Sequence, residues 1–166
     1  MEAPATLELL AEISIGLIGF AGVVTALGRS KLAIQVRSFR TRALVLNSGT
    51  ALFGSLLPLI LLNAGLSVPT VWITSSIALA LIMAFSLAWV TSQTRNLMSQ
   101  AGVPSAVTIL IIVFASFVAF ALLYSSFFAN GFLPRIYPAA VFWSLSLGVF
   151  HFCMLVISIE LPGESS

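Results

Sequence analysis

Long apolar stretches dominate the chain, and short breaks containing glycine, proline or charged residues separate them. A helix needs about 20 mostly apolar residues to cross the hydrocarbon core of a bilayer, which is roughly 30 Å thick. Five stretches qualify, at residues 7–27, 43–64, 71–91, 105–128 and 139–159. The breaks between them contain residues that end or interrupt helices: Gly28, Gly65 with Pro69, Gly102 with Pro104, and Gly131 with Pro134 and Pro138. This pattern predicts a bundle of five transmembrane helices.

The composition excludes a water-soluble domain. Of the 166 residues, 60% are hydrophobic and 7% are charged, whereas a soluble domain carries roughly 25% charged residues. A soluble domain of this length must cover much of its surface with polar groups, which this chain does not have. We therefore expect an all-α integral membrane protein that forms a single membrane domain over residues 1–166, with the lipid bilayer as its surroundings.

The distribution of basic residues predicts the orientation of the helices. Five of the seven lysines and arginines lie between the first two apolar stretches, in a loop at residues 28–42: Arg29, Lys31, Arg37, Arg40 and Arg42. Because basic residues are retained on the cytoplasmic side, this loop is expected to be cytoplasmic. The N-terminus is then outside and the C-terminus cytoplasmic, in a cytoplasmic-type inner or plasma membrane. Seven basic residues spread among apolar helices give no nucleic-acid footprint.

The same loop has two possible structures. Leu32, Val36 and Phe39 recur at helical spacing, which favours a short interfacial helix that lies on anionic headgroups. The alternative is a plain loop whose charges only set the orientation. The five basic side chains are candidate contacts for lipid headgroups.

The first helix carries carboxylates and glycines on one face. At 100° per residue a single arc of about 120° holds Glu8, Glu12, Gly16, Gly19 and Gly22. A charged residue within a span normally faces the bundle interior or a water-filled cavity, and small residues let helices approach closely. We expect this face to meet protein or water, with Glu12 as a cation or proton site. The alternatives for Glu12 are a protonated packing residue or a locally thinned interface.

The second and fifth stretches each carry a polar face. Ser144, Gly148 and His151 align on the fifth stretch, with His151 expected near the middle of the bilayer. Histidine titrates near neutrality, which suits a proton relay or a pH gate, although a lone histidine can also be a packing residue. Asn47 and Pro58 share a face of the second stretch.

Pro58 is expected to kink its helix, because proline has no backbone N–H, and the carbonyl that it frees needs a partner in protein or water. Gly65 and Gly131 are candidates for left-handed helix C-caps, since glycine adopts a positive φ without steric penalty.

No enzyme is expected. The chain has no aspartate, one histidine and one cysteine, Cys153, and it contains none of the common catalytic, metal or nucleotide motifs. We expect no metal site and no cofactor.

Two functional classes remain. The favoured one is an oligomeric ion or proton channel or transporter, with Glu12, His151, Asn47 and Ser144 as candidates for transport or gating of a small cation or proton. The alternative is a non-transporting membrane assembly, sensor or accessory module that packs through glycine and alanine seams. In both classes we expect a homo-oligomer whose packing stripe includes Gly16, Gly19, Gly22 and Gly148.

Overall fold

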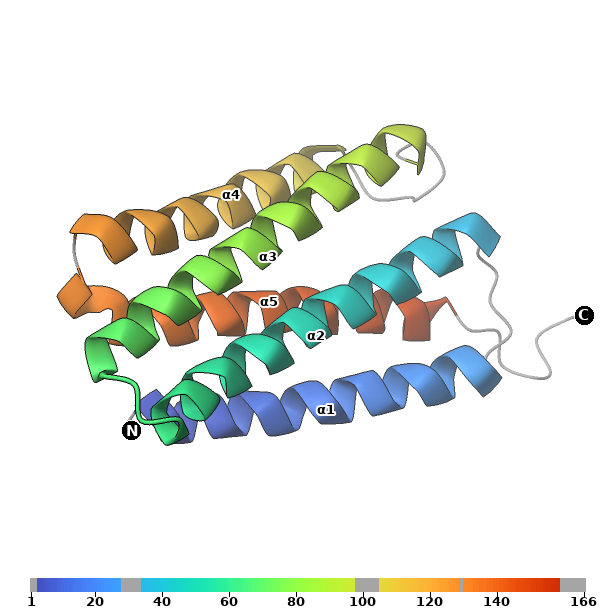
Figure 1. Ribbon diagram of the computed structural model, residues 1–166. Coiled ribbons are helices and arrows are strands. Elements are labelled where there is room, and N and C mark those ends of the chain that lie inside the picture. The colour runs from blue at the N-terminus through green and yellow to red at the C-terminus, as the bar shows by residue number, and fades with distance from the viewer. Residues whose placement is uncertain (1–2, 28–33, 98–104, 129, 159–166) are drawn as a thin grey trace, which may run out of the picture.

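The protein is an all-helical bundle, described by a computed structural model at residues 3–27, 34–97, 105–128 and 130–158 (Figure 1). Five long helices and one 3₁₀ turn follow in order: α1 (Ala3–Leu27), α2 (Ile34–Asn63), α3 (Val68–Leu97), α4 (Ser105–Phe128), η1 (Asn130–Phe132) and α5 (Leu133–Ile157). All five α-helices are long and apolar enough to cross a membrane. Such a bundle is consistent with a small multi-pass membrane protein.

The helices form two groups. α1, α2 and α5 pack together, and α3 and α4 lie as a pair on top of them, with α1 and α4 at the two edges (Figure 1). In the described part of the chain, α1 contacts α2 and α5 alone, and α2 makes no contact with α4. We call the end of the bundle where α2 begins, with Arg37, Arg40 and Arg42, the arginine end.

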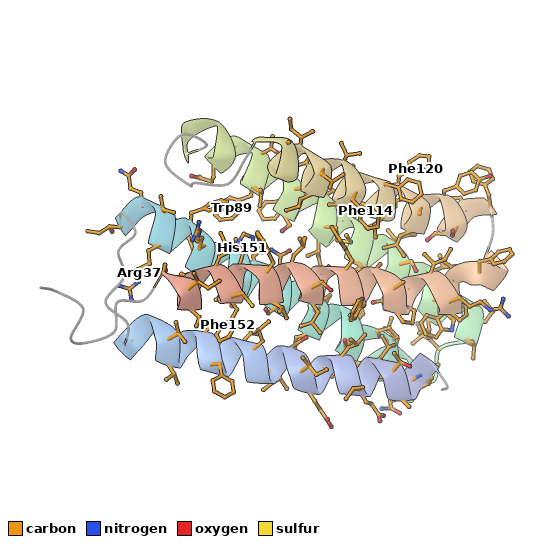
Figure 2. The ribbon with its side chains drawn as sticks, turned by 180° about the vertical axis from the view of Figure 1, so that it is seen from behind. Arg37, Trp89, Phe114, Phe120, His151 and Phe152 are labelled. Atoms are coloured by element: carbon orange, nitrogen blue, oxygen red, sulfur yellow. The ribbon has the colours of Figure 1, made fainter. Side chains whose placement is uncertain are left out.

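The packed core is concentrated away from the arginine end. Its largest cluster includes Trp72, Leu79, Leu122, Leu133 and Tyr137, all buried. A small separate cluster lies closer to the arginine end and contains Ala21, Leu44 and Leu155. Many large apolar side chains instead point outward, such as Phe120 on α4 (Figure 2). That outer surface is suited to lipid, because lipid tails are as apolar as these side chains.

The turn after α2 has the geometry expected for a glycine cap. Gly65 has a φ of 82°, its N–H donates to the Leu62 carbonyl, and the Leu66 N–H donates to the Leu61 carbonyl. This pair of bonds is the Schellman motif, and the prediction for Gly65 is confirmed. The prediction for Gly131 is wrong. Gly131 lies in η1 and its φ is not positive, because this 3₁₀ turn leads directly into α5.

α2 begins nine residues earlier than the sequence predicts. Residues 34–42 are the first turns of α2, so neither a loop nor a separate interfacial helix is present there, and residues 28–33 of the predicted loop lie outside the described residues. The role of the basic residues in orientation stays a prediction. Arginine favours helix nearly as strongly as leucine does, and a helix can continue beyond the hydrocarbon into water. From Arg42 to Asn63 the helix rises by about 32 Å, which already matches the thickness of the hydrocarbon core. If Asn63 lies at one face of such a core, the turns that precede Arg42 extend beyond the other.

α5 also begins earlier than predicted, at Leu133 instead of residue 139. Pro134 lies in its first turn, where no backbone donor is needed. The helix therefore rises by about 27 Å before it reaches His151. The sequence analysis expected His151 near the middle. It lies instead toward the arginine end of the bundle. The remaining helices agree more closely: α4 matches the predicted residues 105–128, and α1 and α3 extend past their predicted spans by up to six residues.

Candidate functional site

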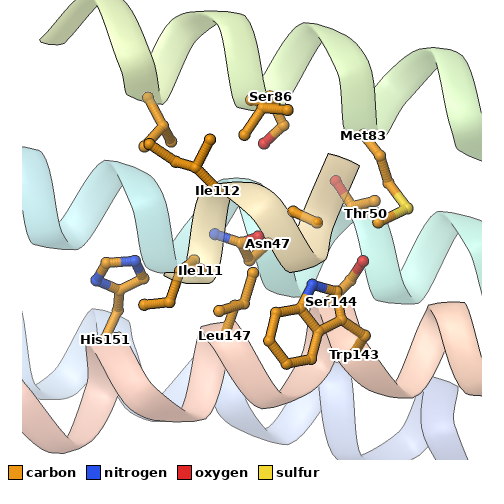
Figure 3. Close-up of a pocket in the computed structure, with 13 residues that line it drawn as sticks. Asn47, Thr50, Met83, Ser86, Ile111, Ile112, Trp143, Ser144, Leu147 and His151 are labelled. Atoms are coloured by element: carbon orange, nitrogen blue, oxygen red, sulfur yellow. The ribbon is translucent and has the colours of Figure 1, made fainter. Parts of the chain in front are cut away.

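A cavity whose mainly apolar wall includes several polar side chains lies between α2, α3, α4 and α5, where α2 and α4 do not touch (Figure 3). Its volume is about 60 Å³. One water needs roughly 10–15 Å³ on this measure, so the cavity has room for a few waters. Five polar side chains line it, namely those of Asn47, Thr50, Ser86, Ser144 and His151, and the rest of its wall is apolar. Its size suits water or a very small solute.

Three of the four residues predicted for transport or gating meet at this cavity. Asn47 comes from α2, whereas Ser144 and His151 come from α5 (Figure 3). The two polar faces read separately from the sequence therefore converge on one space. Glu12, the fourth candidate, does not line it.

Close packing of α2 against α5 brings these faces together. Gly148 of α5 lies so near α2 that an added Cβ would be 2.5 Å from the Ser48 Oγ and 3.2 Å from the Leu17 Cδ2. A larger residue at position 148 would force the side chains of Ser48 on α2 and Leu17 on α1 to shift. Gly148 thus lies at a close helix contact, as expected of a packing glycine.

The polar side chains of the cavity have spare hydrogen-bonding capacity. Asn47 donates to the Ala43 carbonyl at 2.7 Å, and Thr50 donates to the Leu46 carbonyl at 2.8 Å. Ser144 donates to the Ala140 carbonyl at 3.3 Å. In each case the side-chain oxygen can still accept a hydrogen bond. The buried indole N–H of Trp143, another lining residue, has no partner among the described residues and can donate one to water.

Aromatic rings connect the cavity to the surface at the arginine end. The Phe39 ring meets His151 edge-on at 6.3 Å and stacks on Trp89 at 5.8 Å. His151 borders the cavity, whereas Phe39 and Trp89 border a groove on the outside. Phe39 therefore stands between the two spaces.

Arg40 was predicted to contact lipid headgroups, but its side chain is buried within the bundle. Its side chain is 6% exposed, and its Nη1 donates to the Met154 carbonyl in the last turn of α5 at 3.2 Å. The last four carbonyls of a helix have no partner within the helix, and they attract cations. This placement joins the start of α2 to the end of α5 and brings Arg40 close enough to His151 to act on it electrostatically.

Tyr137 supplies the partner that Pro58 makes necessary. Pro58 has no N–H for the carbonyl of Gly54 four residues earlier, and the Tyr137 hydroxyl donates to that oxygen at 2.6 Å. Trp72 packs edge-on against the Tyr137 ring, with 5.7 Å between centroids. This part of the bundle, away from the arginine end, is tightly closed.

The carboxylate and glycine face of α1 points away from the bundle. Glu8 and Glu12 are exposed, and an added Cβ at Gly16, Gly19 or Gly22 would meet nothing within 4 Å. The side of α1 that is buried carries Leu7, Leu10, Ala11, Ser14, Leu17 and Ala21. The expectation that the stripe faces the interior is wrong for the single chain. The physical reason is that leucine gains no advantage from lipid over protein, so bulk alone does not mark the lipid-facing side.

The remaining predicted lipid contacts are the other basic residues near the start of α2. Arg37 is half-buried and Arg42 is exposed on the first turns of α2, whereas Arg29 and Lys31 lie outside the described residues. Within the described ranges, no group of three histidine, cysteine or acidic residues can hold a metal ion.

The sequence analysis missed Ser86 and Trp143 as cavity residues. Trp143 resembles an interfacial aromatic in sequence. Ser86 follows the buried residues Leu79 and Met83 at spacings of four and three, and this helical spacing is a usable signal for one face of α3.

No protein-family model, curated protein or solved structure matches the chain.

Proposed function

We propose that this protein is a small membrane permeation protein in which the cavity forms the middle section of a path for protons. The observation that carries the proposal is the convergence of Asn47, Ser144 and His151 on one internal cavity. Burying polar groups costs free energy unless hydrogen bonds compensate it. The free acceptors of Asn47, Thr50 and Ser144 favour water in the cavity, which can complete their hydrogen bonds.

The chemistry of the cavity favours a proton over a metal cation. A dehydrated metal ion needs several oxygen ligands, and no carboxylate is among the residues that line the cavity. The positive charge of Arg40 near His151 also opposes a resident cation. A proton instead moves along waters, hydroxyls and an imidazole that accepts on one nitrogen and donates from the other.

Phe39 is the gate in this proposal. Its ring lies between His151 and Trp89, and so between the cavity and the surface at the arginine end. Rotation of one side chain would let water reach His151. Hydrophobic constrictions of this kind control water in known channels.

Proton flux into liposomes tests the proposal. Purified protein is reconstituted with a pH-sensitive dye inside, and a potassium diffusion potential drives the flux. We expect flux above that of empty liposomes, with His151→Gln reducing it to the empty-liposome level. Ser144→Ala is expected to lower the flux, whereas Ser146→Ala is the matched control. Ser146 makes the same type of bond, to the Phe142 carbonyl, but does not line the cavity.

Two results would contradict the proposal. The first is wild-type flux no greater than that of empty liposomes. The second is equal flux in the wild type and in His151→Gln.

A second candidate function rests on the outer face of α1. Glu12 and the glycines there have no covering residues in the single chain, and a carboxyl group that faces hydrocarbon is costly. Contact with a second copy would cover this face and bring backbones close together at the glycines. In this reading the protein is an assembly module.

The mass of the protein in detergent, measured by light scattering, tests the assembly. We expect an oligomer that Gly19→Leu breaks and that Ile13→Phe leaves intact, because Ile13 is exposed on a different side of α1. A monomeric wild type would remove this candidate.

A further inference from the structure

An open groove runs along the surface between the first turns of α2 and the last turns of α3, on the outer side of Phe39. It consists of two adjoining hollows of about 370 and 480 Å³, and a third of about 340 Å³ lies beside them on α2 alone; Arg42 borders all three. We propose that this groove binds one anionic phospholipid, with its phosphate at Arg42 and an acyl chain along Val45 and Phe85.

The groove has a polar half and an apolar half. Toward the arginine end its wall includes Gln35, Ser38 and Gln93, which can hydrogen-bond a headgroup. On the other side of Arg42 the wall is formed largely by Val45, Leu46 and Phe85, and Phe85 is 70% exposed. A phospholipid has the same order of groups along its length.

The position of the groove along the bundle matches a bilayer interface. Because α2 rises by about 32 Å between Arg42 and Asn63, Arg42 reaches one interface when Asn63 is at the other. Trp89, which also borders the groove, lies about 25 Å along α3 from Trp72, in agreement with two interfacial aromatic belts. The polar half of the groove is then level with headgroups and the apolar half with acyl chains.

The charge of the groove favours an anionic lipid. Arg42 is exposed, and no carboxylate in the described ranges pairs with it, since the acids there are Glu8 and Glu12 on α1. A guanidinium can bind two phosphate oxygens at once. A lipid with net negative charge gains from Arg42, whereas a zwitterionic lipid carries its own compensating cation.

Quenching of tryptophan fluorescence by brominated lipids tests the site in the full-length protein. Vesicles of phosphatidylcholine contain a small fraction of either brominated phosphatidylglycerol or brominated phosphatidylcholine. We expect the anionic lipid to be preferred about fivefold, the effect of roughly one basic residue near the surface. Trp89→Phe identifies the part of the quenching that comes from the groove.

Substitutions separate this site from a general attraction to charge. Arg42→Gln is expected to abolish the preference. Arg135→Gln is the matched control, because Arg135 is an exposed arginine in the first turn of α5, at the other end of the bundle, and it is expected to keep the preference.

Native mass spectrometry gives a readout that does not depend on tryptophan. We expect the wild type to retain one phosphatidylglycerol per chain, and both Arg42→Gln and Val45→Trp to lose it. The proposal is overturned if both brominated lipids quench equally, or if Arg42→Gln keeps the preference. It is also overturned if neither lipid quenches Trp89, since another protein surface, such as a second copy, then covers the groove. None of these outcomes depends on whether the cavity conducts protons.

Discussion

The hydrogen bond from Tyr137 to Gly54 gives the sharpest test of the packing described above. Tyr137→Phe removes the hydroxyl and keeps the ring, so the contact with Trp72 is retained. The Gly54 carbonyl then has no donor, because Pro58 cannot supply the N–H that an ordinary residue would. We expect Tyr137→Phe to lower the free energy of unfolding.

The magnitude follows from the burial of both partners. Tyr137 is fully buried and Gly54 is buried beside it. A buried polar group left without a partner costs about 1–3 kcal/mol, whereas hydrogen bonds within membrane proteins average about 0.6 and reach about 1.7 kcal/mol. We therefore expect a loss of about 1–1.5 kcal/mol. In a Pro58→Ala background the new N–H of residue 58 can bond to the Gly54 carbonyl, and the same change should cost under about 0.5 kcal/mol.

Reversible unfolding by sodium dodecyl sulfate in mixed micelles measures the four proteins of this double-mutant cycle, with circular dichroism as the signal. The coupling between the two substitutions should be about 1 kcal/mol. If Tyr137→Phe costs the same in both backgrounds, Pro58 is not the reason that Gly54 needs Tyr137. If it costs nothing in either, the bond adds no stability.

Three further substitutions test separate contacts, two by the same unfolding assay and the third by amide exchange. Gly148→Ala should destabilise by about 1–3 kcal/mol, because its Cβ would overlap Ser48, whereas Gly49→Ala, with open space around it, should be neutral or stabilising. Gly65→Ala should cost about 1–2 kcal/mol because of its positive φ, and a neutral result would mean that another cap replaces this one. Arg40→Gln should loosen the first turns of α2, seen as faster amide exchange at residues 34–39; unchanged exchange would show that the bond to α5 does not hold them.

The number of helices could be predicted from the sequence, because the length and apolarity of a span depend on bilayer thickness alone. The residues at which α2 and α5 begin could not be predicted. The charges of Arg37 and Arg40 indicated a loop between two spans. A helix can nevertheless continue through charged residues once it has left the hydrocarbon. Pro134 resembles a helix breaker, although it is well suited to the first turn of a helix.

The faces of the helices were harder to predict than their number. The polar faces of Asn47 and of Ser144 with His151 could be read from spacing, because a buried polar group must find a partner. The outward direction of Glu12 could not, since neither leucine nor glycine has a fixed preference between lipid and protein. That direction depends on how α1 packs on α2 and α5, and this is a long-range property of the chain.

Because the Gly54 carbonyl of α2 receives its hydrogen bond from Tyr137 of α5, it lacks this partner while the protein is being synthesised. The two bonded residues are 83 positions apart, and α5 is the last of the five helices to be made. At about 5–20 residues per second, the Gly54 carbonyl waits about 4–17 seconds for its partner. During that interval a nascent α2 in lipid requires water or an insertion factor at this carbonyl. A crosslinker at residue 54 should therefore capture such a factor during translation, and Pro58→Ala should abolish the capture; capture that persists in Pro58→Ala would show that the unpaired carbonyl is not what the factor recognises.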